Sequence, residues 1–498
     1  MDIHPLHDLL AHFTTLSPPV RRTVYHQLLD QLQLHEWRDV RDRLHQVSFH
    51  RDIVASLPLE LAVQIVKHLD LSELHLLRRV SRSWRSLLSS ELACDAVFKK
   101  YTGPRGTSPQ TRQEYARQRL RLERGLPVWA IHPPVDAHRP ILLTPNTAQY
   151  GMDYAKGRYA WIYDDHATLV VQDLRTRHMR AFCTENRDIF SRIRISDSIL
   201  AAITPRGYCI VWELLASGDD GTDPVSFRIP SVNCTAFVVS GVHVAIAIDG
   251  KDCSVIHWDL HSRVARTISI ARTISIARTI SIAQPIVFMA LNPASNLLVT
   301  AHIEEASLRI ANHPLATPKD QNHPPASYTL DLPSIPATLA QPAPFQSASS
   351  VGYFRLTPRH REDQTLVEGD RLVAATYDEC LDRVSIHLLP SEDVLFEDRC
   401  VAAPVDHNLL YYLKNDRGKP RVWISNPDAL PAARHRPARA VDPQLPREAT
   451  GRVYSSSGAF TLMGDRDFVL MVDENGLKMW CFNESVEEWN FEDFQPEV

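Results

Sequence analysis

The sequence has little glycine: 17 glycines among 498 residues, against 34 prolines. Soluble proteins average about 7% glycine and about 5% proline, so this chain is punctuated by proline more than by glycine. That balance argues against a fold that holds phosphate on glycine-rich loops. The chain also lacks the patterns of phosphate loops, nucleophile elbows, His-Glu-x-x-His sites and EF-hands. We therefore expect no catalytic residues, no cofactor and no enzyme activity in this chain.

Cysteine is scarce as well, with eight residues and no Cys-x-x-Cys pair. This predicts a reducing compartment rather than a disulfide framework or a zinc ribbon. The N-terminus lacks the features of a secretory signal, and no apolar run approaches the ~18 residues of a membrane span. His4, His7 and His12 fall near one helical face without a further ligand, so no metal site is expected. We expect a protein of the cytoplasm or the nucleus.

Charge is uneven along the chain, although its net value is only −5. Residues 1–125 contain 19 Lys and Arg against 14 Asp and Glu, and the remainder contains 35 against 45. Apolar spacing changes at the same place, from helical periodicity to the short runs typical of strands. The sequence thus predicts an α+β multidomain chain, with a helical N-terminal region followed by one large all-β domain.

Residues 1–50 are predicted to form short amphipathic helices that break at Pro18-Pro19. Ser17 is placed to cap the helix that starts there. Apolar residues then follow at four-residue intervals: Val20, Val24, Leu28 and Leu32. This stripe needs a covering surface, which is either the next domain or a second copy of the segment.

The most informative stretch of the chain lies between Ile53 and Leu88. Ser56 is placed to cap a helix with Pro58 near its first position, and Ser72 is placed to cap a second helix. A third short helix follows. Helices this short cannot bury all their leucines and a tryptophan among themselves, so some of this surface must meet another domain or another protein.

The spacing of Leu57-Pro58-x-Glu60-Leu61, Asp70-Leu71 and Val80-Ser81-x-x-Trp84 resembles the F-box family, and we assign residues 51–98 to such a domain. The resemblance implies binding to a Skp-type adaptor and, through it, to a cullin–RING ubiquitin ligase. It also implies a set of adaptor-contacting residues: Leu57, Pro58, Leu61, Ile65, Leu69, Leu74, Val80 and Trp84. Residues 1–50 resemble the dimerisation element that precedes the F-box in several WD-repeat members.

Residues 99–125 are predicted to form a basic linker helix. Eight Lys and Arg stand against two Glu between residues 99 and 124. The main interpretation is a solvated connecting helix. Nucleic-acid binding is the alternative, but it needs more than one basic helix without interleaved aromatic residues.

Residues 126–490 are predicted to form a WD-like β-propeller. Val211-Trp-Glu-Leu and Ile256-His-Trp-Asp-Leu resemble the ends of WD-repeat third strands, although most units lack the Gly-His start of that repeat. We predict seven blades, and a β-sandwich or several small β domains is the alternative. The last strand would close the ring with residues 125–136 or with a strand near Tyr150. The short apolar runs fall into seven pairs: 159–174, 193–213, 237–260, 286–310, 371–388, 409–425 and 460–482.

Three stretches interrupt the β pattern. Proline-rich inserts at 313–349 and 427–447 are predicted to be surface connections. Residues 266–283 contain Arg-Thr-Ile-Ser-Ile-Ala three times over. Because 18 residues are too many for one strand of a blade, we expect one copy to form an outer strand and the other two to extend it.

Together these features predict a substrate receptor of an SCF-type ubiquitin ligase. The F-box would bind the adaptor, and the propeller would hold a protein substrate, phosphorylated or not. The alternative is a non-catalytic scaffold that binds the Skp adaptor outside a cullin ligase. The substrate-binding residues are not identified by the sequence. No membrane partner is expected, and a homodimer is expected if residues 1–50 self-associate.

Overall fold

The computed structural model places most of the helical region and most of the β domain. It divides into two compact units, residues 1–64 and 65–498, which we describe separately. The described residues are 4–46, 57–102, 109–131, 151–214, 223–248, 254–269, 286, 288–304, 307–315, 326–331, 343–348, 351–356, 371–378, 383–390, 402–406, 409–416, 419–425, 461–473 and 476–489.

The first unit contains α1 (His4–Thr15), α2 (Pro18–Asp30), α3 (Leu34–Gln46) and the start of α4 (Leu59–Val66). The predicted break is confirmed, because Ser17 is the extended N-cap residue of α2 and prolines occupy its first turn. No residue of α2 is buried. Leu28 is 56% exposed and Leu34 is 75% exposed. The apolar side chains of these helices are therefore left uncovered.

The second unit begins with the end of α4 and continues through four helices: α5 (Leu71–Leu77), α6 (Arg82–Leu88), α7 (Glu91–Thr102) and α8 (Pro109–Arg124). The predicted cap of α5 is wrong, since Asp70 is its N-cap and Ser72 lies inside the helix. The Glu73 carboxylate accepts a hydrogen bond from the Asp70 backbone N–H at 3.0 Å. This bond belongs to a capping box, which makes Asp70 the residue at which the helix begins.

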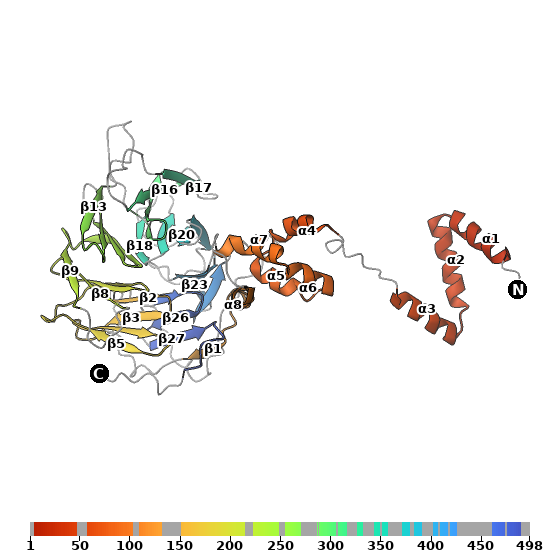
Figure 1. Ribbon diagram of the computed structural model, residues 1–498, viewed down its shortest axis with the longest axis horizontal. Coiled ribbons are helices and arrows are strands. Elements are labelled where there is room, and N and C mark those ends of the chain that lie inside the picture. The colour runs from red at the N-terminus through yellow and green to blue at the C-terminus, as the bar shows by residue number, and fades with distance from the viewer. Residues whose placement is uncertain are drawn as a thin grey trace. The chain divides into compact units, whose positions relative to one another are not determined.

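The β domain is a propeller of antiparallel sheets (Figure 1). Six sheets have the four strands of a complete blade, and a further sheet has three strands within the described residues. Each of the seven predicted pairs of runs falls within one of these sheets.

The first three blades follow chain order. They are β2 (Met152–Ala155), β3 (Arg158–Ile162), β4 (Leu169–Asp173) and β5 (Met179–Phe182); β6 (Arg192–Ile195), β7 (Ile199–Ile203), β8 (Tyr208–Glu213) and β9 (Val225–Arg228); β10 (Cys234–Ser240), β11 (His243–Ile248), β12 (Ser254–Asp259) and β13 (Ala265–Ser269).

The remaining sheets complete the ring. They are β14 (Phe288–Asn292), β15 (Leu297–Glu304), β16 (Ser307–Pro314) and β17 (Ala326–Asp331); β18 (Ala343–Ala348), β19 (Val351–Leu356), β20 (Arg371–Asp378) and β21 (Arg383–Pro390); β22 (Ala402–Asp406), β23 (Leu409–Asp416) and β24 (Lys419–Ser425); β25 (Thr461–Gly464), β26 (Phe468–Asp473), β27 (Gly476–Cys481) and β1 (Trp129–Ile131).

The ring closes through β1, the strand from residues 125–136 that was one of the two predicted candidates. Trp129 pairs with Cys481 and Ile131 with Met479, so the first strand of the domain completes the blade formed by its last three strands. This arrangement covers the outer edge of β27, which would otherwise present unpaired backbone groups.

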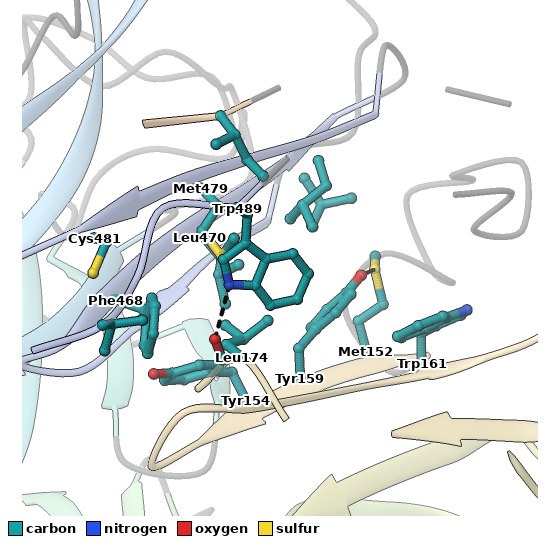
Figure 2. Close-up of a cluster of buried hydrophobic side chains, with 14 of the residues drawn as sticks. Met152, Tyr154, Tyr159, Trp161, Leu174, Phe468, Leu470, Met479, Cys481 and Trp489 are labelled. Atoms are coloured by element: carbon teal, nitrogen blue, oxygen red, sulfur yellow. Dashed lines mark hydrogen bonds between the residues drawn. The ribbon is translucent and has the colours of Figure 1, made fainter. Parts of the chain in front are cut away.

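Apolar cores fill the spaces between neighbouring blades. Figure 2 shows one of them, where Phe468 and Met479 of the closing blade pack with Tyr154 and Tyr159 of the blade that contains β2. Trp489, beyond the last strand, belongs to the same core, and its Nε1 donates to the Leu174 carbonyl at 3.0 Å. The C-terminal segment therefore fastens the closing blade to its neighbour.

Because glycine is scarce, several turns place other residues in the left-handed backbone conformation. Six described residues other than glycine adopt positive φ, and only four glycines do. These residues are Lys156, His166, Arg177, Arg187, Arg263 and Asn296. A left-handed conformation costs a residue with a Cβ roughly 1–2 kcal/mol. The WD-like turns thus form without their usual glycines, and the packing of the blades offsets the conformational free energy of these left-handed residues.

The repeated segment is described only in part. β13 contains residues 265–269, the start of the first copy, and pairs with β12 as the outer strand of its blade. One copy thus forms an outer strand, as predicted. The other copies and the proline-rich insert at 427–447 lie outside the described residues. The prediction of a surface connection at 313–349 is wrong in part, because β17 and β18 lie within that range as strands of two blades.

Candidate adaptor-binding surface and its link to the propeller

The helices that resemble an F-box are held by side-chain hydrogen bonds, one of them local and two between α5 and α7. The Ser81 hydroxyl caps α6 by accepting from the Trp84 backbone N–H at 3.1 Å. The Tyr101 hydroxyl lies 3.2 Å from Asp70 Oδ1, to which it donates, and 3.4 Å from the Leu71 N–H. α7 is thereby tied to the N-terminus of α5.

The residues implied in adaptor binding differ in exposure. Leu61 is 53% exposed, Ile65 46% and Val80 61%. Pro58 is exposed, whereas Leu57, Leu69 and Trp84 are partly buried. Pro58, Leu61, Ile65 and Val80 are therefore the exposed members of this set. Leu57, Pro58 and Leu61 belong to the first unit and the other five residues to the second.

Leu74 is the exception among these eight residues, because only 2% of it is exposed. It lies in α5, which contacts α8 within the second unit. In the chain on its own, Leu74 therefore packs inward, and any contribution it makes to adaptor binding would come through the position of α5.

The prediction that the basic helix is solvated is wrong for α8. Arg119, on this helix, is only 1% exposed. Its Nη1 lies 3.1 Å from Asp406 Oδ2 at the end of β22, and its Nε lies 2.8 Å from Glu123 Oε1. Burial alone would lower the pKa of Arg119, but the carboxylates of Asp406 and Glu123 raise it, so the group stays charged.

More contacts hold α8 on the propeller. The Tyr115 hydroxyl donates to Asp406 Oδ1 at 2.9 Å, and the Tyr411 hydroxyl of β23 donates to the Leu122 carbonyl at 2.5 Å. Figure 1 shows α8 beside β23. Gln118 Nε2 donates to Asp467 Oδ1 at 2.7 Å, in the turn between β25 and β26. Two blades therefore take part in docking this helix.

Two further basic residues of α8 pair with a carboxylate at its surface. Arg117 Nη1 lies 2.7 Å from Glu484 Oε2, and Arg121 Nη2 lies 2.6 Å from Glu484 Oε1. The hydrogen bonds from Arg121 and Arg117 lower the pKa of Glu484. The positive charge of α8 is thus directed at acidic groups of this same chain, which disfavours the nucleic-acid alternative.

One feature of the sequence indicates that α8 packs on the propeller. Tyr115 and Leu122, two of the few large apolar residues of α8, are seven positions apart and so share a helical face; both are buried. Arg119 lies on that face between them. A tyrosine and a leucine on one face do not predict that the arginine between them is buried. Its partner Asp406, which makes the burial possible, lies far away in the sequence.

The chain carries an F-box domain: residues 55–92 match the F-box domain family. It is followed by a β-propeller with WD-like strands. No curated protein sequence matches the chain. F-box domains bind Skp-type adaptors and propellers bind protein partners, and this pairing is that of an adaptor-type receptor rather than of a catalytic protein.

Several solved structures are similar to part of the chain. The Cps50 (Swd1) propeller domain from Myceliophteria thermophila is 11% identical, with 67% of this chain and 97% of that chain covered and a TM-score of 0.37. Raptor from Chaetomium thermophilum is 13% identical, with 69% and 29% covered and a TM-score of 0.39. The N-terminal domain of Nup159 is 11% identical, with 70% and 92% covered and a TM-score of 0.36.

Two kinds of feature are absent from the residues that the structure describes. No group of three or more His, Cys, Asp and Glu side chains within them could hold a metal ion. No helix among them is long and apolar enough to cross a membrane.

Proposed function

We propose that the protein is a substrate-recognition subunit of an SCF-type ubiquitin ligase. The F-box domain would bind a Skp-type adaptor, and the propeller would bind the protein to be ubiquitinated. The observation that carries this proposal is the docking of α8, which joins the helical region to one blade through the buried Arg119 and to a second blade through Gln118. A receptor needs such a link, because its task is to hold one partner at a set place relative to another.

The mechanism we propose is positioning. A substrate held on the propeller meets the ubiquitin-charged enzyme at a raised effective concentration, so catalysis is left to other subunits. α8 would transmit position well, since Tyr115 in its middle and Arg119 and Leu122 in its C-terminal half are all bonded to the propeller.

The adaptor-binding residues we propose are the eight named from the F-box pattern. Pro58, Leu61, Ile65 and Val80 are the best candidates for direct contact, because they are exposed. Burial of one large aliphatic side chain contributes roughly 1.5–3 kcal/mol, so a few such residues suffice for a stable contact.

Residues 1–50 are proposed as a dimerisation element. All three helices of this segment expose apolar side chains, among them Leu9, Leu28 and Trp37. We also propose that the protein acts in the cytoplasm or the nucleus, where cullin ligases and their adaptors meet.

The test is a pull-down of adaptor, cullin and RING subunits by the full-length chain. Pro58→Ala with Leu61→Ala should abolish adaptor recovery while the propeller stays folded. Tyr208→Ala is the matched control, since it removes a comparably exposed side chain, 42% exposed, from the propeller. Adaptor recovery that survives the double substitution would contradict the assignment.

The same experiment separates the receptor from a scaffold. A receptor should bring down cullin and RING subunits together with the adaptor. Recovery of the adaptor alone would favour a complex that never joins a ligase.

A further inference from the structure

A cavity of about 180 Å³ lies within the second unit, where α5, α7 and α8 meet. One part of its lining is apolar and contains Leu74, Phe98 and Ala116. Another part is basic and contains Arg78 and Arg112. An engineered cavity of about 150 Å³ accepts benzene, so this space is large enough for a small ring.

Three nitrogen atoms of the cavity-lining residues lack a partner. His75 Nδ1, Arg78 Nε and Arg112 Nε are buried and have no hydrogen-bond partner among the described residues. Other atoms hold the two guanidinium groups in place: Arg78 Nη2 donates to the Leu88 carbonyl at 3.2 Å, and Arg112 Nη1 lies 2.5 Å from Asp95 Oδ1. A buried donor without an acceptor costs free energy, so the two arginine Nε–H groups beside one cavity point to a missing acceptor. His75 Nδ1 is a donor in only one of the two neutral tautomers.

The charges around the cavity favour an anion. Glu91 is on the lining but is exposed, so water screens its charge. Asp95 already pairs with Arg112. Burial, together with Arg78, lowers the pKa of His75, so this imidazole is neutral at neutral pH. Among the described residues, Arg78 is then the guanidinium group of the lining without an acidic partner, with Arg112 beside it, and guanidinium groups suit carboxylate and phosphate oxygens.

We propose that this cavity binds a small organic anion, a carboxylate or phosphate on an apolar body about the size of a benzene ring. The anionic group would accept from Arg78 and Arg112 after a small adjustment of their side chains. The ring would pack on Phe98 and Ala116. Such a ligand would bridge the F-box helices and α8, the helix that docks on the propeller.

The experiment is a fluorine NMR titration of the full-length chain with para-fluorobenzoate and para-fluorophenyl phosphate. Saturable binding of at least one of them is expected, with weaker binding of neutral fluorobenzene. Arg78→Gln should weaken binding by roughly tenfold or more, since it removes a charge-assisted hydrogen bond. Arg79→Gln is the matched control, because Arg79 is the exposed neighbour and does not line the cavity.

If Arg78→Gln fails to fold, a second variant still tests the proposal. Ser89 is exposed and lines the cavity, so Ser89→Phe adds a ring there without removing a buried contact. It should also block the anion. Absence of saturable binding, equal binding of fluorobenzene, unchanged binding by Ser89→Phe, or an equal loss in Arg79→Gln would each overturn the proposal. None of these readouts involves the adaptor, so they are independent of the proposed ligase role.

Discussion

Arg119 Nη1 on α8 lies 3.1 Å from Asp406 Oδ2 at the end of β22, and the two residues are 287 positions apart in the chain. Both groups are largely buried, with side-chain exposures of 2% and 10%. A buried arginine is tolerated only when its donors are matched, and here Glu123 supplies the second acceptor. Through this contact α8, the helix that precedes the propeller in the chain, becomes part of the packing of the propeller itself.

Loss of the Arg119 charge should destabilise the protein strongly. Arg119→Met would leave Asp406 and Glu123 as buried carboxylates without their cation, at a cost of about 3–5 kcal/mol in the free energy of unfolding. Urea denaturation measures this change. Arg121→Ala is the control: its partner Glu484 is exposed, so the loss should stay within about 1 kcal/mol. Equal losses in the two variants would contradict the role given to Arg119.

The C-terminal segment should contribute to stability through Trp489. Trp489→Ala removes a ring from the core of Figure 2 together with the hydrogen bond to Leu174, and we expect a loss of about 3–5 kcal/mol in thermal or urea unfolding. Glu487→Ala changes a side chain that is 94% exposed and should leave stability within about 0.5 kcal/mol. A mild effect of Trp489→Ala would mean that the segment does not hold the blades together.

Stability should fall as the pH drops from about 6.5 to about 4, because of two buried histidines. Burial lowers the pKa of His257 and of His313 to about 4, from the ordinary value of 6.5. Each imidazole is therefore neutral in the fold, and the unfolded chain binds the proton first. The stabilisation is complete above pH 6.5 and is lost as the pH falls toward 4, by up to about 3 kcal/mol for each residue.

Urea midpoints measured between about pH 4 and 7 check this pH dependence. His257→Asn should flatten the profile in part, by removing one of the buried titrating histidines. His261→Asn, at an exposed neighbour, should leave the profile unchanged. A profile that stays flat in the unmodified chain would show that neither histidine is buried as described.

Two of the three hexamers should be dispensable. Removal of residues 272–283 leaves one Arg-Thr-Ile-Ser-Ile-Ala copy, which is enough for β13 and keeps Ile268 packed on the core beside Val255. Soluble yield and melting temperature should therefore be unchanged. Removal of all three copies, residues 266–283, takes away the outer strand and should lower both. Insoluble protein after the shorter deletion would refute this view.

The elements of the chain were predictable because their signals are local. Pro18 marks a helix start, the F-box motifs stand at short spacing between Leu57 and Trp84, and short apolar runs mark strands within a few residues. The same reasoning missed the cap of α5, where Ser72 was predicted and Asp70 is the N-cap in the structure. Only the reciprocal bond with Glu73 distinguishes them in the structure.

The sequence by itself determined the order of the parts: exposed amphipathic helices, an F-box, a basic helix and a propeller of degenerate units. Each of these follows from residue types at short spacing. The tertiary structure decided which charges are buried, which strand closes the ring and where a cavity lies. Arg119 looked like one more solvated charge until Asp406 was brought to it, and β1 became the partner of β27 only in the closed ring. Such contacts depend on residues hundreds of positions apart, and no local pattern encodes them.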